Sequence, residues 1–365
     1  MIEQPFSLVG NDAFYKHPQY IESTKQELAS NALTSHVDYV YQSENYFYRI
    51  GKKIFSIVVF PIIVYRVFHE YMGKKIIPAT SSRLYKYSNE LRKQINLRQK
   101  WKYKRLAIEV DGKRIDAILV GTEKTLGNRR WVLVSNGNGE LYEYRAQGKE
   151  LHTMLTLLGG NALLFNYPGV GASQGAPNRQ LMKDVYRGML AFLEDSEKGI
   201  GATEIIAYGH SIGAGIQGEA VDGYALKENI KYVFVKSRTF SSLSDAVYYI
   251  SKSTFLEYLI KILGWDINPL RSSLKLKSPE IILQTVKIQE EDDSDHLVIY
   301  TDLTEKEIKF IVDDEIIPYK ASLARALLEK RKYSNKVFIG IPESHNEPLS
   351  DIPYLVRKIE EKLSG

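Results

Sequence analysis

The chain has 365 residues, a formal net charge of +5 at pH 7, and ordinary proportions of charged residues, glycine and proline. This length is sufficient for one large domain or two smaller ones with a substantial core, and the composition excludes a globally disordered protein. Cysteine is absent, which excludes disulfides, a cysteine nucleophile and thiolate metal sites, and is consistent with a reducing compartment.

The N-terminal part of the chain contains a conspicuous apolar stretch. The first ten residues lack the basic segment and continuous apolar core of a secretory signal, so we expect a cytoplasmic or peripheral membrane protein. The apolar run at 54–65 is shorter than the roughly 20 residues of a membrane-spanning helix and contains Pro61. It is a poor spanning helix, and two interpretations stay open: a segment packed on the main domain, or an element inserted at a membrane interface.

A basic belt follows this stretch. Residues 74–105 carry many lysines and arginines, with Glu90 as their single acid. Because an anionic lipid surface attracts such a belt, an anionic membrane is the partner predicted for residues 52–105, with a solvated helix face as the alternative. No recognised nucleic-acid motif accompanies the charge, so we expect no nucleic-acid binding. Residues 1–105 are interpreted as a helical N-terminal extension.

From residue 106 to 365 the pattern is that of strands alternating with helices. Two segments of period two, at 106–110 and 114–120, flank Asp111 and Gly112 and predict a β-hairpin. Further strands are expected at 131–134, 161–165, 204–208, 232–236, 280–286, 309–312 and 336–340, and helices at 141–158, 179–194, 319–330 and from about 354. This alternation predicts an α/β fold with a mostly parallel, doubly wound sheet.

Residues 245–265 carry apolar and aromatic side chains at helical spacing. The simpler interpretation is a set of helices that face the core. The alternative is a helical cap or lid over the site, which would occupy about residues 243–275.

The most distinctive pattern lies at residues 203–215. An apolar strand ends at Gly209 and a helix restarts after Gly213, and between them Ser211 completes the pattern Gly-x-Ser-x-Gly. Small residues are needed there because the nucleophile of such a turn has a strained backbone and the strand and helix approach closely. The motif occurs by chance in many proteins, but its position between strand and helix favours a nucleophilic serine.

A serine nucleophile needs a base and a carboxylate that orients the base. In the chain order Ser, acid, His, only His296 and His345 follow Ser211. His296 lies in an acidic run that is more simply a solvated loop than a calcium site, so His345 is the predicted base, with a solvated loop histidine as its alternative. The spacing Asp-x-x-Ile-Pro selects Asp314 as the acid, and Asp313 is the second candidate.

Backbone N–H groups are the predicted oxyanion donors. They would come from Ile212, directly after the nucleophile, and from Asn138, in the loop after strand 131–134. An ordinary Asn-Gly turn explains Asn138 equally well. The glycine-rich loop at 169–175 lacks the spacing of a dinucleotide loop, and no Gly-Lys-Ser/Thr sequence is present, so we predict no cofactor and no metal.

With these residues assembled, the chain from about residue 106 resembles the α/β-hydrolase superfamily, in particular the branch of bud-emergence-type serine hydrolases. The matching segments are Asn136-Gly137-Asn138, 166–175, 209–213, 239–242, 314–318 and 344–346. The apolar and basic N-terminal stretch also resembles the chlamydial CHLPS-type proteins, which implies a bacterial protein delivered to a host cell and acting at its membranes. Two features depart from the superfamily: Asn136 replaces a histidine, and residues 287–310 are inserted before the acid.

Together these features predict a serine hydrolase with the triad Ser211, Asp314 and His345. An ester or thioester with an apolar acyl chain, either a small molecule or lipid-like, is the expected substrate, because the aromatic residues of 245–265 could line an apolar pocket. The activity would be that of an esterase, lipase or thioesterase, and a peptidase remains open. The rival hypothesis is a catalytically silent protein that keeps the hydrolase fold as a membrane-associated binding or effector module.

Overall fold

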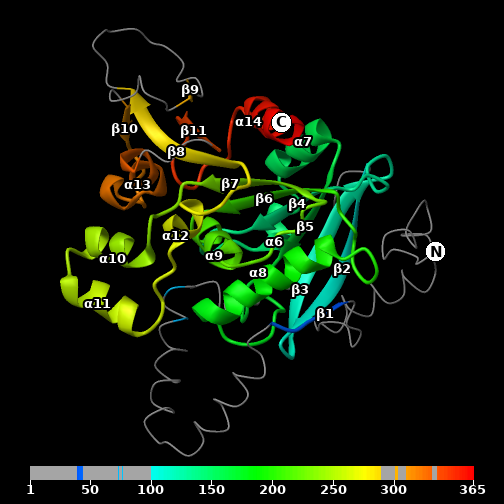
Figure 1. Cartoon of the computed structure of the whole chain (residues 1–365), viewed down its shortest axis with the longest axis horizontal. Coiled ribbons are helices and arrows are strands. Elements are labelled where there is room, and N and C mark those ends of the chain that lie inside the picture. The colour runs from blue at the N-terminus through cyan, green and yellow to red at the C-terminus, as the bar shows by residue number, and fades with distance from the viewer. Residues whose placement is uncertain are drawn as a thin grey trace, which may run out of the picture. The chain divides into compact units, whose positions relative to one another are not determined.

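The computed structural model describes residues 39–43, 73, 76, 100–288, 301, 302, 310–330 and 335–365. The described chain forms two compact units, one from the residues up to 148 together with 159–203, the other from 149–158 together with 204–365 (Figure 1). Three predictions lie outside the described residues: the interfacial role of 54–65, almost all of the basic belt, and the loop that holds His296.

The first unit is built on a mixed sheet in which β4 and β5 are parallel and β3 is antiparallel to both β2 and β5. In spatial order its strands are β1 (Tyr39–Tyr41), β2 (Trp101–Val110), β3 (Lys113–Thr122), β5 (Asn161–Phe165) and β4 (Arg130–Ser135). The hairpin predicted around Asp111 and Gly112 is confirmed, and both residues have the positive φ values, 48° and 73°, that such a tight turn requires.

Helix α8 (Arg179–Glu194) packs against β2 and β4 of this unit, and its first turn is capped by Asn178, whose side chain accepts the Leu181 N–H. The single helix predicted over 141–158 is wrong. The chain forms α6 (Tyr142–Arg145) and then, after Gly148, α7 (Lys149–Leu158), which belongs to the second unit. The glycine-rich loop after β5 is a turn in which Gly169 and Gly175 have φ values of 76° and 95°, so it has the structural role that its glycines suggest.

The second unit contains parallel pairs between β6 and β7, β7 and β8, and β8 and β11, so the mostly parallel sheet is confirmed. Its strands are β6 (Glu204–His210), β7 (Lys231–Ser237), β8 (Glu280–Ile288), β11 (Lys336–Ile341) and β9 (Thr301–Asp302), with β10 (Phe310–Val312) antiparallel to the end of β8. The strand predicted at 309–312 therefore exists as β10, which pairs antiparallel with the last residues of β8.

Helices cover both faces of these strands. In Figure 1, α7 and α14 (Ile352–Ser364) lie on one side of β7, and α9 (Ile212–Val221) and α12 (Pro269–Ser273) lie on the other. The remaining helices of the unit are α10 (Leu243–Ser251), α11 (Thr254–Ile262), the 3-10 turn η3 (Tyr319–Ala321) and α13 (Leu323–Glu329). The doubly wound arrangement expected from the alternation of elements is thus present in the unit that carries Ser211.

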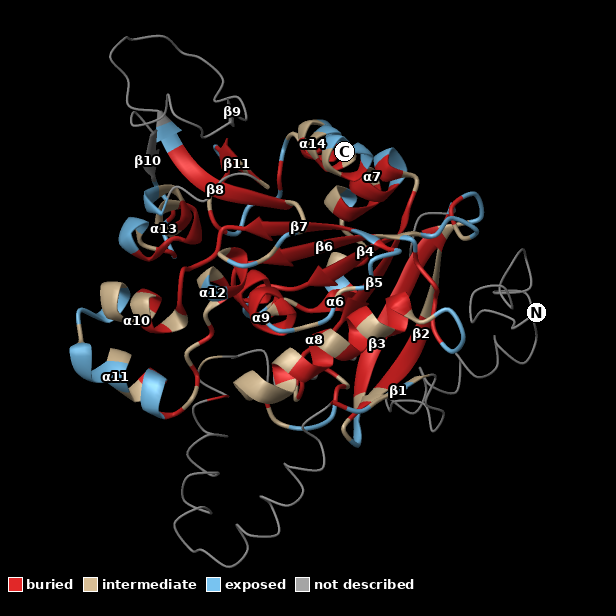
Figure 2. Ribbon diagram, viewed as in Figure 1, coloured by how far each residue is buried: buried red, intermediate tan, exposed pale blue. Residues whose placement is uncertain are grey.

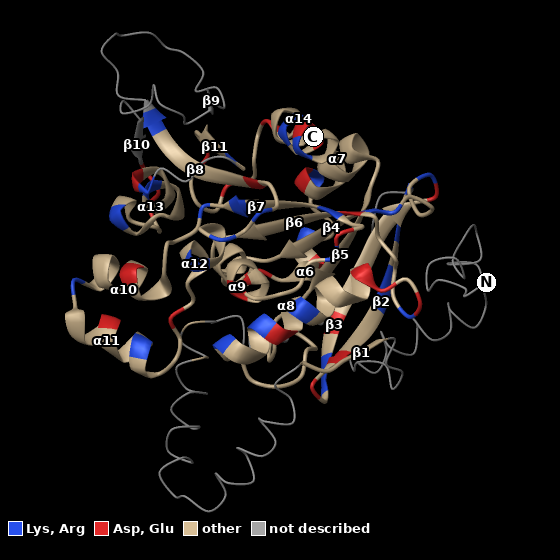
Figure 3. Cartoon of the chain, in the orientation of Figure 1, with Lys and Arg blue, Asp and Glu red and all other residues tan. Residues whose placement is uncertain are grey.

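Helices α10 and α11 pack against each other within the region expected to hold a cap. The core-facing interpretation holds for Ala246 and Ile260, which are buried, but large apolar side chains on the same hairpin are exposed to solvent (Figure 2). These are Ile250, Phe255, Leu256, Tyr258 and Ile262. Charges of both signs are interspersed among them (Figure 3), so the hairpin presents an apolar surface without an excess of one charge.

An ionic cluster is buried inside the strands of the second unit. Glu280 lies directly opposite Lys336 in the register of β8 and β11, and Lys236 reaches it from β7. The side chains of Lys236 and Glu280 are fully buried; Lys236 Nζ lies 2.6 Å from Ser273 Oγ, and Lys336 Nζ lies 2.7 Å from Glu280 Oε2. Each charge has an opposite charge in contact, which is the condition for keeping ions inside a protein.

Candidate active site

The turn around Ser211 has the strained geometry that its sequence predicts. Strand β6 ends at His210, α9 begins at Ile212, and Ser211 between them has φ 53° and ψ −123°, a conformation that non-glycine residues rarely adopt. The helix that follows is buried along its whole length. A Cβ atom added at Gly218 would lie 2.6 Å from the Cα of Pro269, so α9 approaches α12 as closely as only glycine allows.

The structure brings Ser211, Asp314 and His345 together within the second unit. His345 Nε2 lies 3.0 Å from Ser211 Oγ, and His345 Nδ1 lies 2.9 Å and 3.0 Å from the two carboxylate oxygens of Asp314. The three residues follow β6, β10 and β11 respectively. All three are buried, with His345 only 2% exposed. Residues distant in sequence thus form one continuous chain of hydrogen bonds.

This geometry fixes what each group can do. With its Nδ1–H donated to the carboxylate, the neutral imidazole of His345 leaves Nε2 as an acceptor for the Ser211 hydroxyl. A histidine held in that tautomer can take the proton from the serine and later return it. The arrangement has the geometry in which these groups can act as a nucleophile, a base and an orienting acid.

Asp314 is held as a carboxylate by its surroundings. Its Oδ1 accepts the backbone N–H groups of Ile316 and Ile317 at 2.9 Å and 2.8 Å, in addition to the contact with His345. Burial raises the pKa of Asp314, but the hydrogen bonding and electrostatic attraction of His345, with the two backbone donors, outweigh burial and hold the pKa below its ordinary value of 3.8. The group is therefore ionised at neutral pH, as an orienting acid must be.

The second candidate for the acid, Asp313, is excluded by its position. Its side chain is 44% exposed and forms an ion pair with Lys287 rather than with the histidine. Sequence reasoning missed Glu315, whose two carboxylate oxygens accept the backbone N–H of His345 at 2.9 Å and 3.1 Å. The only signal for Glu315 in the sequence is its place directly after Asp314.

The two predicted oxyanion donors fall in different units. Ile212 is the first residue of α9, where a backbone N–H has no partner within the helix and points out of its N-terminal end. Asn138 belongs to the first unit, is exposed, and precedes Gly139, which has φ 81°, as in an ordinary Asn-Gly turn. The participation of both residues in an oxyanion hole stays a prediction.

Asn136, which stands where the resembled superfamily has histidine, is buried at the end of β4. Its backbone carbonyl accepts the hydroxyl of Tyr167 at 2.8 Å. Its side-chain amide makes no hydrogen bond with any residue that the structure describes. The backbone at this position is therefore fixed from within the first unit, while the side chain adds no polar contact there.

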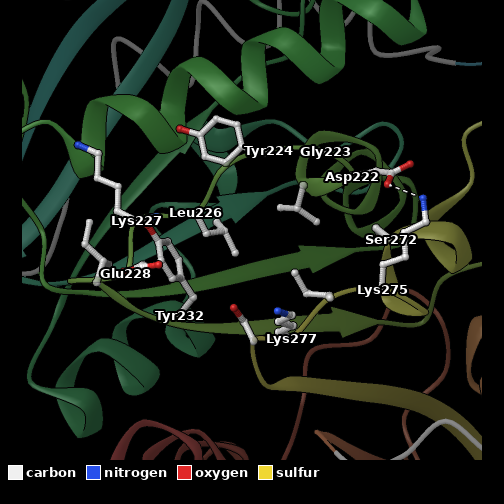
Figure 4. A pocket seen from close by; sticks show the side chains of 14 residues that line it. Asp222, Gly223, Tyr224, Leu226, Lys227, Glu228, Tyr232, Ser272, Lys275 and Lys277 are labelled. Atoms are coloured by element: carbon white, nitrogen blue, oxygen red, sulfur yellow. Dashed lines mark hydrogen bonds and ion pairs between the residues drawn. The ribbon is translucent and has the colours of Figure 1, made fainter.

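A pocket of about 470 Å³ lies at the C-terminal end of α9 (Figure 4). It is lined by the segment around Asp222, the start of β7 near Tyr232, and the segment around Lys275, whose Nζ lies 3.4 Å from the carboxylate of Asp222. Ser211 is at the other end of this ten-residue helix, about 15 Å away at 1.5 Å per residue. Since no triad residue lines the pocket, it is separate from the site at Ser211.

No group of histidine and acidic side chains within the described residues is arranged to hold a metal ion. The same residues contain no helix with the length and apolar character needed to cross a bilayer.

The family of the chain follows from a comparison with family models. The model described as "Chlamydia CHLPS protein (DUF818)" matches residues 16–364, nearly the entire sequence. The chain belongs to this family. The resemblance noted from the apolar and basic N-terminal stretch is thereby confirmed, and the match extends through the α/β part that carries Ser211, Asp314 and His345. No curated protein matches the sequence of this CHLPS-family chain.

Several solved structures are similar to this CHLPS-family protein. The esterase Pf2001 of Pyrococcus furiosus is 16% identical, with 72% of this chain and 90% of that chain covered and a TM-score of 0.49. An alpha-beta hydrolase of Vibrio vulnificus is 16% identical over 78% and 93% of the two chains, with a TM-score of 0.47. Est1E of Butyrivibrio proteoclasticus is 12% identical over 71% and 100%, with a TM-score of 0.48. The function proposed below does not depend on these likenesses.

The α/β-hydrolase fold expected from the sequence is confirmed by the chain itself. A parallel strand leads through the strained residue Ser211 into a buried helix, and the acid and the histidine follow in the order Asp314, then His345, after later strands. This strand, turn and helix, with the order Ser, Asp, His, define that fold.

Proposed function

We propose that this protein is a serine hydrolase that cleaves a carboxylic ester or thioester. The observation that carries the proposal is the continuous hydrogen-bonded chain from Ser211 Oγ through both ring nitrogens of His345 to the carboxylate of Asp314. Each member is buried, and the acid is held in its ionised form. A surface histidine or a chance Gly-x-Ser-x-Gly sequence would not produce all these features together.

The proposed reaction has two halves. As Ser211 Oγ attacks the acyl carbonyl, His345 Nε2 takes the hydroxyl proton, and the negative charge that develops on the carbonyl oxygen is stabilised by the N–H of Ile212. The leaving alcohol or thiol departs with that proton and an acyl-serine remains. Water then attacks the acyl-serine while His345 takes a proton from the water. His345 returns that proton to the Ser211 oxygen, and the carboxylic acid product leaves. Asp314 holds the imidazole in position throughout.

An apolar acyl chain is the proposed substrate feature. The α10–α11 hairpin, in the same unit as the triad, exposes Phe255, Tyr258 and Ile262 at 69%, 64% and 56%. Large exposed apolar side chains gathered on one element commonly mark an interaction surface for an apolar ligand or an interface. We propose that the acyl group comes from a small or lipid-like ester, with esterase, lipase and thioesterase activities to be separated by the leaving group.

Labelling with a fluorophosphonate probe tests the proposal. The native chain should be labelled at neutral pH, and the variants Ser211→Ala and His345→Ala should lose labelling while still unfolding cooperatively in urea. Ser251→Ala, which changes an exposed serine of α10, is the matched control and should label like the native chain. A folded native chain that takes up no probe would instead favour the catalytically silent binding module, and labelling that survives in Ser211→Ala would refute the nucleophile.

A further inference from the structure

Residues that flank Arg238 hold the backbone of the nucleophile from both sides. The N–H of Ser211 donates to the carbonyl of Ser237 at 2.9 Å, and the hydroxyl of Thr239 donates to the carbonyl of Ser211 at 2.8 Å. Ser211 is one of few non-glycine residues with positive φ in the described chain, and a strained residue persists only where its surroundings fix it. The two contacts supply that restraint.

Arg238 itself reaches the base loop, which is the segment between β11 and α14 that carries His345. It is 3% exposed, and its Nη1 donates to the backbone carbonyls of Ser344 and of Glu347, the latter at 2.9 Å. These carbonyls lie on either side of His345 in the sequence. One guanidinium nitrogen therefore holds the base loop at two points, and the longer side chain and fixed planar geometry of arginine suit this reach better than the shorter, flexible side chain of lysine.

The backbone of Arg238 is also constrained. Its φ is 49°, in the left-handed region, and its N–H donates to the carbonyl of Leu283 on β8 at 2.8 Å. Because the chain leaves β7 in this conformation, the side chain of Arg238 reaches the base loop while its neighbours Ser237 and Thr239 contact Ser211. A non-glycine residue adopts such a conformation at a cost in free energy, and residues strained in this way cluster at functional sites.

Three further hydrogen bonds restrain the base loop, two of them to glutamate carboxylates and one from a threonine hydroxyl. Glu347 accepts the N–H of Ser344 at 2.9 Å, Glu315 accepts the N–H of His345, and the hydroxyl of Thr285 donates to the carbonyl of Glu343 at 2.7 Å. These contacts hold the loop to itself, to the acid loop and to β8. The contacts of Arg238 connect the base loop to the strand end that also holds Ser211.

We propose that Ser237, Arg238 and Thr239 form a positioning segment, in which Arg238 sets the place of His345 relative to Ser211. The inference rests on the proposed function and deepens it. Ser211 and His345 are 134 residues apart in sequence, yet their reacting atoms lie 3.0 Å apart. Because consecutive residues hold the nucleophile on one side and the base loop on the other, a single short piece of backbone determines that distance. Misplacement of a catalytic group by about 1 Å can slow a reaction by roughly 100-fold.

The test compares Arg238→Lys and Arg238→Gly with the native chain. Lysine keeps the charge but has a shorter side chain without the fixed planar geometry, and glycine keeps access to the left-handed backbone but removes the side chain. Readouts are the rate of fluorophosphonate labelling of Ser211, kcat and KM for p-nitrophenyl butyrate, and the urea unfolding midpoint. Arg271→Lys, an exposed arginine of α12, is the control and should leave all of them unchanged.

We expect both Arg238 variants to label about 10- to 100-fold more slowly, with kcat lowered and KM nearly unchanged. Millimolar methylguanidinium should restore part of the rate in Arg238→Gly and none in Ser211→Ala, a result that a merely structural role of Arg238 does not produce. Thr239→Val, which removes only the contact to the Ser211 carbonyl, should give a smaller loss and serves if the Arg238 variants do not fold.

Two results overturn the inference. A folded Arg238→Lys that labels within two-fold of the native rate would show that the guanidinium does not position the base. The inference also fails if the Arg238 variants label slowly only to the extent that they are unfolded. In that case methylguanidinium would not restore the rate and Thr239→Val would label like the native chain, which would show that Arg238 has a structural role. A folded native chain that is never labelled is a different outcome, which refutes the proposed function and this inference with it.

Discussion

The second unit contains two buried polar clusters, and they are built in different ways. In the ionic cluster, Lys236, Glu280 and Lys336 lie on neighbouring strands and contact one another directly. In the triad, Ser211, Asp314 and His345 each follow a strand and lie on connecting segments. Burial is similar in the two clusters, so burial alone does not distinguish a structural group from a reactive one.

The difference lies in what holds each side chain. The members of the ionic cluster are placed by strand register, and their charges are satisfied by each other and by Ser273. The members of the triad are placed by contacts to the backbone around them, such as Ile317 to Asp314 and Glu315 to His345. In a strand, the regular hydrogen bonding between neighbouring strands fixes the place of each side chain. A connecting segment lacks that regular pairing and needs specific contacts to its own backbone, and such contacts can hold a strained residue such as Ser211.

The electrostatics of the clusters differ as well. Burial lowers the pKa of Lys236, and the nearby charge of Glu280 opposes this only in part. Burial raises the pKa of Glu280, but the ammonium groups of Lys236 and Lys336 outweigh it and hold the pKa below the ordinary value of 4.5. In the ionic cluster, then, the charges stabilise one another, while the carboxylate of Asp314 faces the ring of His345, which under the proposed function becomes an imidazolium during the reaction.

The largest expected effect that distinguishes the triad from the ionic cluster is the loss of activity in Asp314→Asn. An amide cannot hold His345 in the tautomer that accepts the serine proton, so we expect kcat for p-nitrophenyl butyrate to fall by about 10⁴-fold. The neighbouring acid provides the control: Asp313→Asn, which loses only an exposed ion pair with Lys287, should keep nearly native kcat. Equal losses in the two variants would contradict the assignment of Asp314.

The next effect should be on stability instead of activity. Glu280→Gln leaves two buried ammonium groups without their shared carboxylate, and we expect the free energy of unfolding in urea to fall by about 3–5 kcal/mol. Glu257→Gln, at an exposed i,i+4 pair with Lys261 on α11, should cost about 0.5 kcal/mol or less. If Glu280→Gln instead unfolds like the Glu257 variant, the ionic cluster does not stabilise the strands.

The smallest effect is a pH dependence that should distinguish the native chain from Asp314→Asn. Because the folded pKa of Asp314 lies below its ordinary value of 3.8, its ionised form contributes stability that is complete above that value and is lost as pH falls through the lowered pKa. Between about pH 4 and pH 2 the native free energy of unfolding should fall more steeply than that of the variant, by up to about 1.4 kcal/mol per pH unit. If the free energy of unfolding in urea fell equally with pH in the two proteins, the ionised carboxylate of Asp314 would not stabilise the folded state.

Sequence reasoning predicted the parts of the site that rest on local patterns. The Gly-x-Ser-x-Gly turn, the spacing that selects Asp314 and the position of His345 after the last strand can all be read over a few residues. The alternation of apolar strands and helices gave the α/β class and the mostly parallel pairing for the same reason. The structure places these elements where the pattern indicates.

Other features depend on contacts between distant segments and have no local signal. The register that puts Glu280 opposite Lys336 cannot be derived from either strand alone. Neither Arg238 nor Glu315 belongs to a spacing pattern, although both contact the base loop. The helical period of residues 245–265 predicts helices but not which side of them is covered, so it left core-facing helices and a lid both open and could not show that Phe255 and Tyr258 are exposed.

The tight crossing of α9 and α12 leaves no room for larger side chains on the helix that follows Ser211. A side chain at Gly218 would overlap the backbone of Pro269, and one at Gly215 would lie 2.9 Å from the ring of Phe240. The helix that follows Ser211 consequently cannot shift or gain bulk without moving its neighbours. A larger side chain at Gly215 or Gly218 would therefore require compensating changes at Phe240 or Pro269.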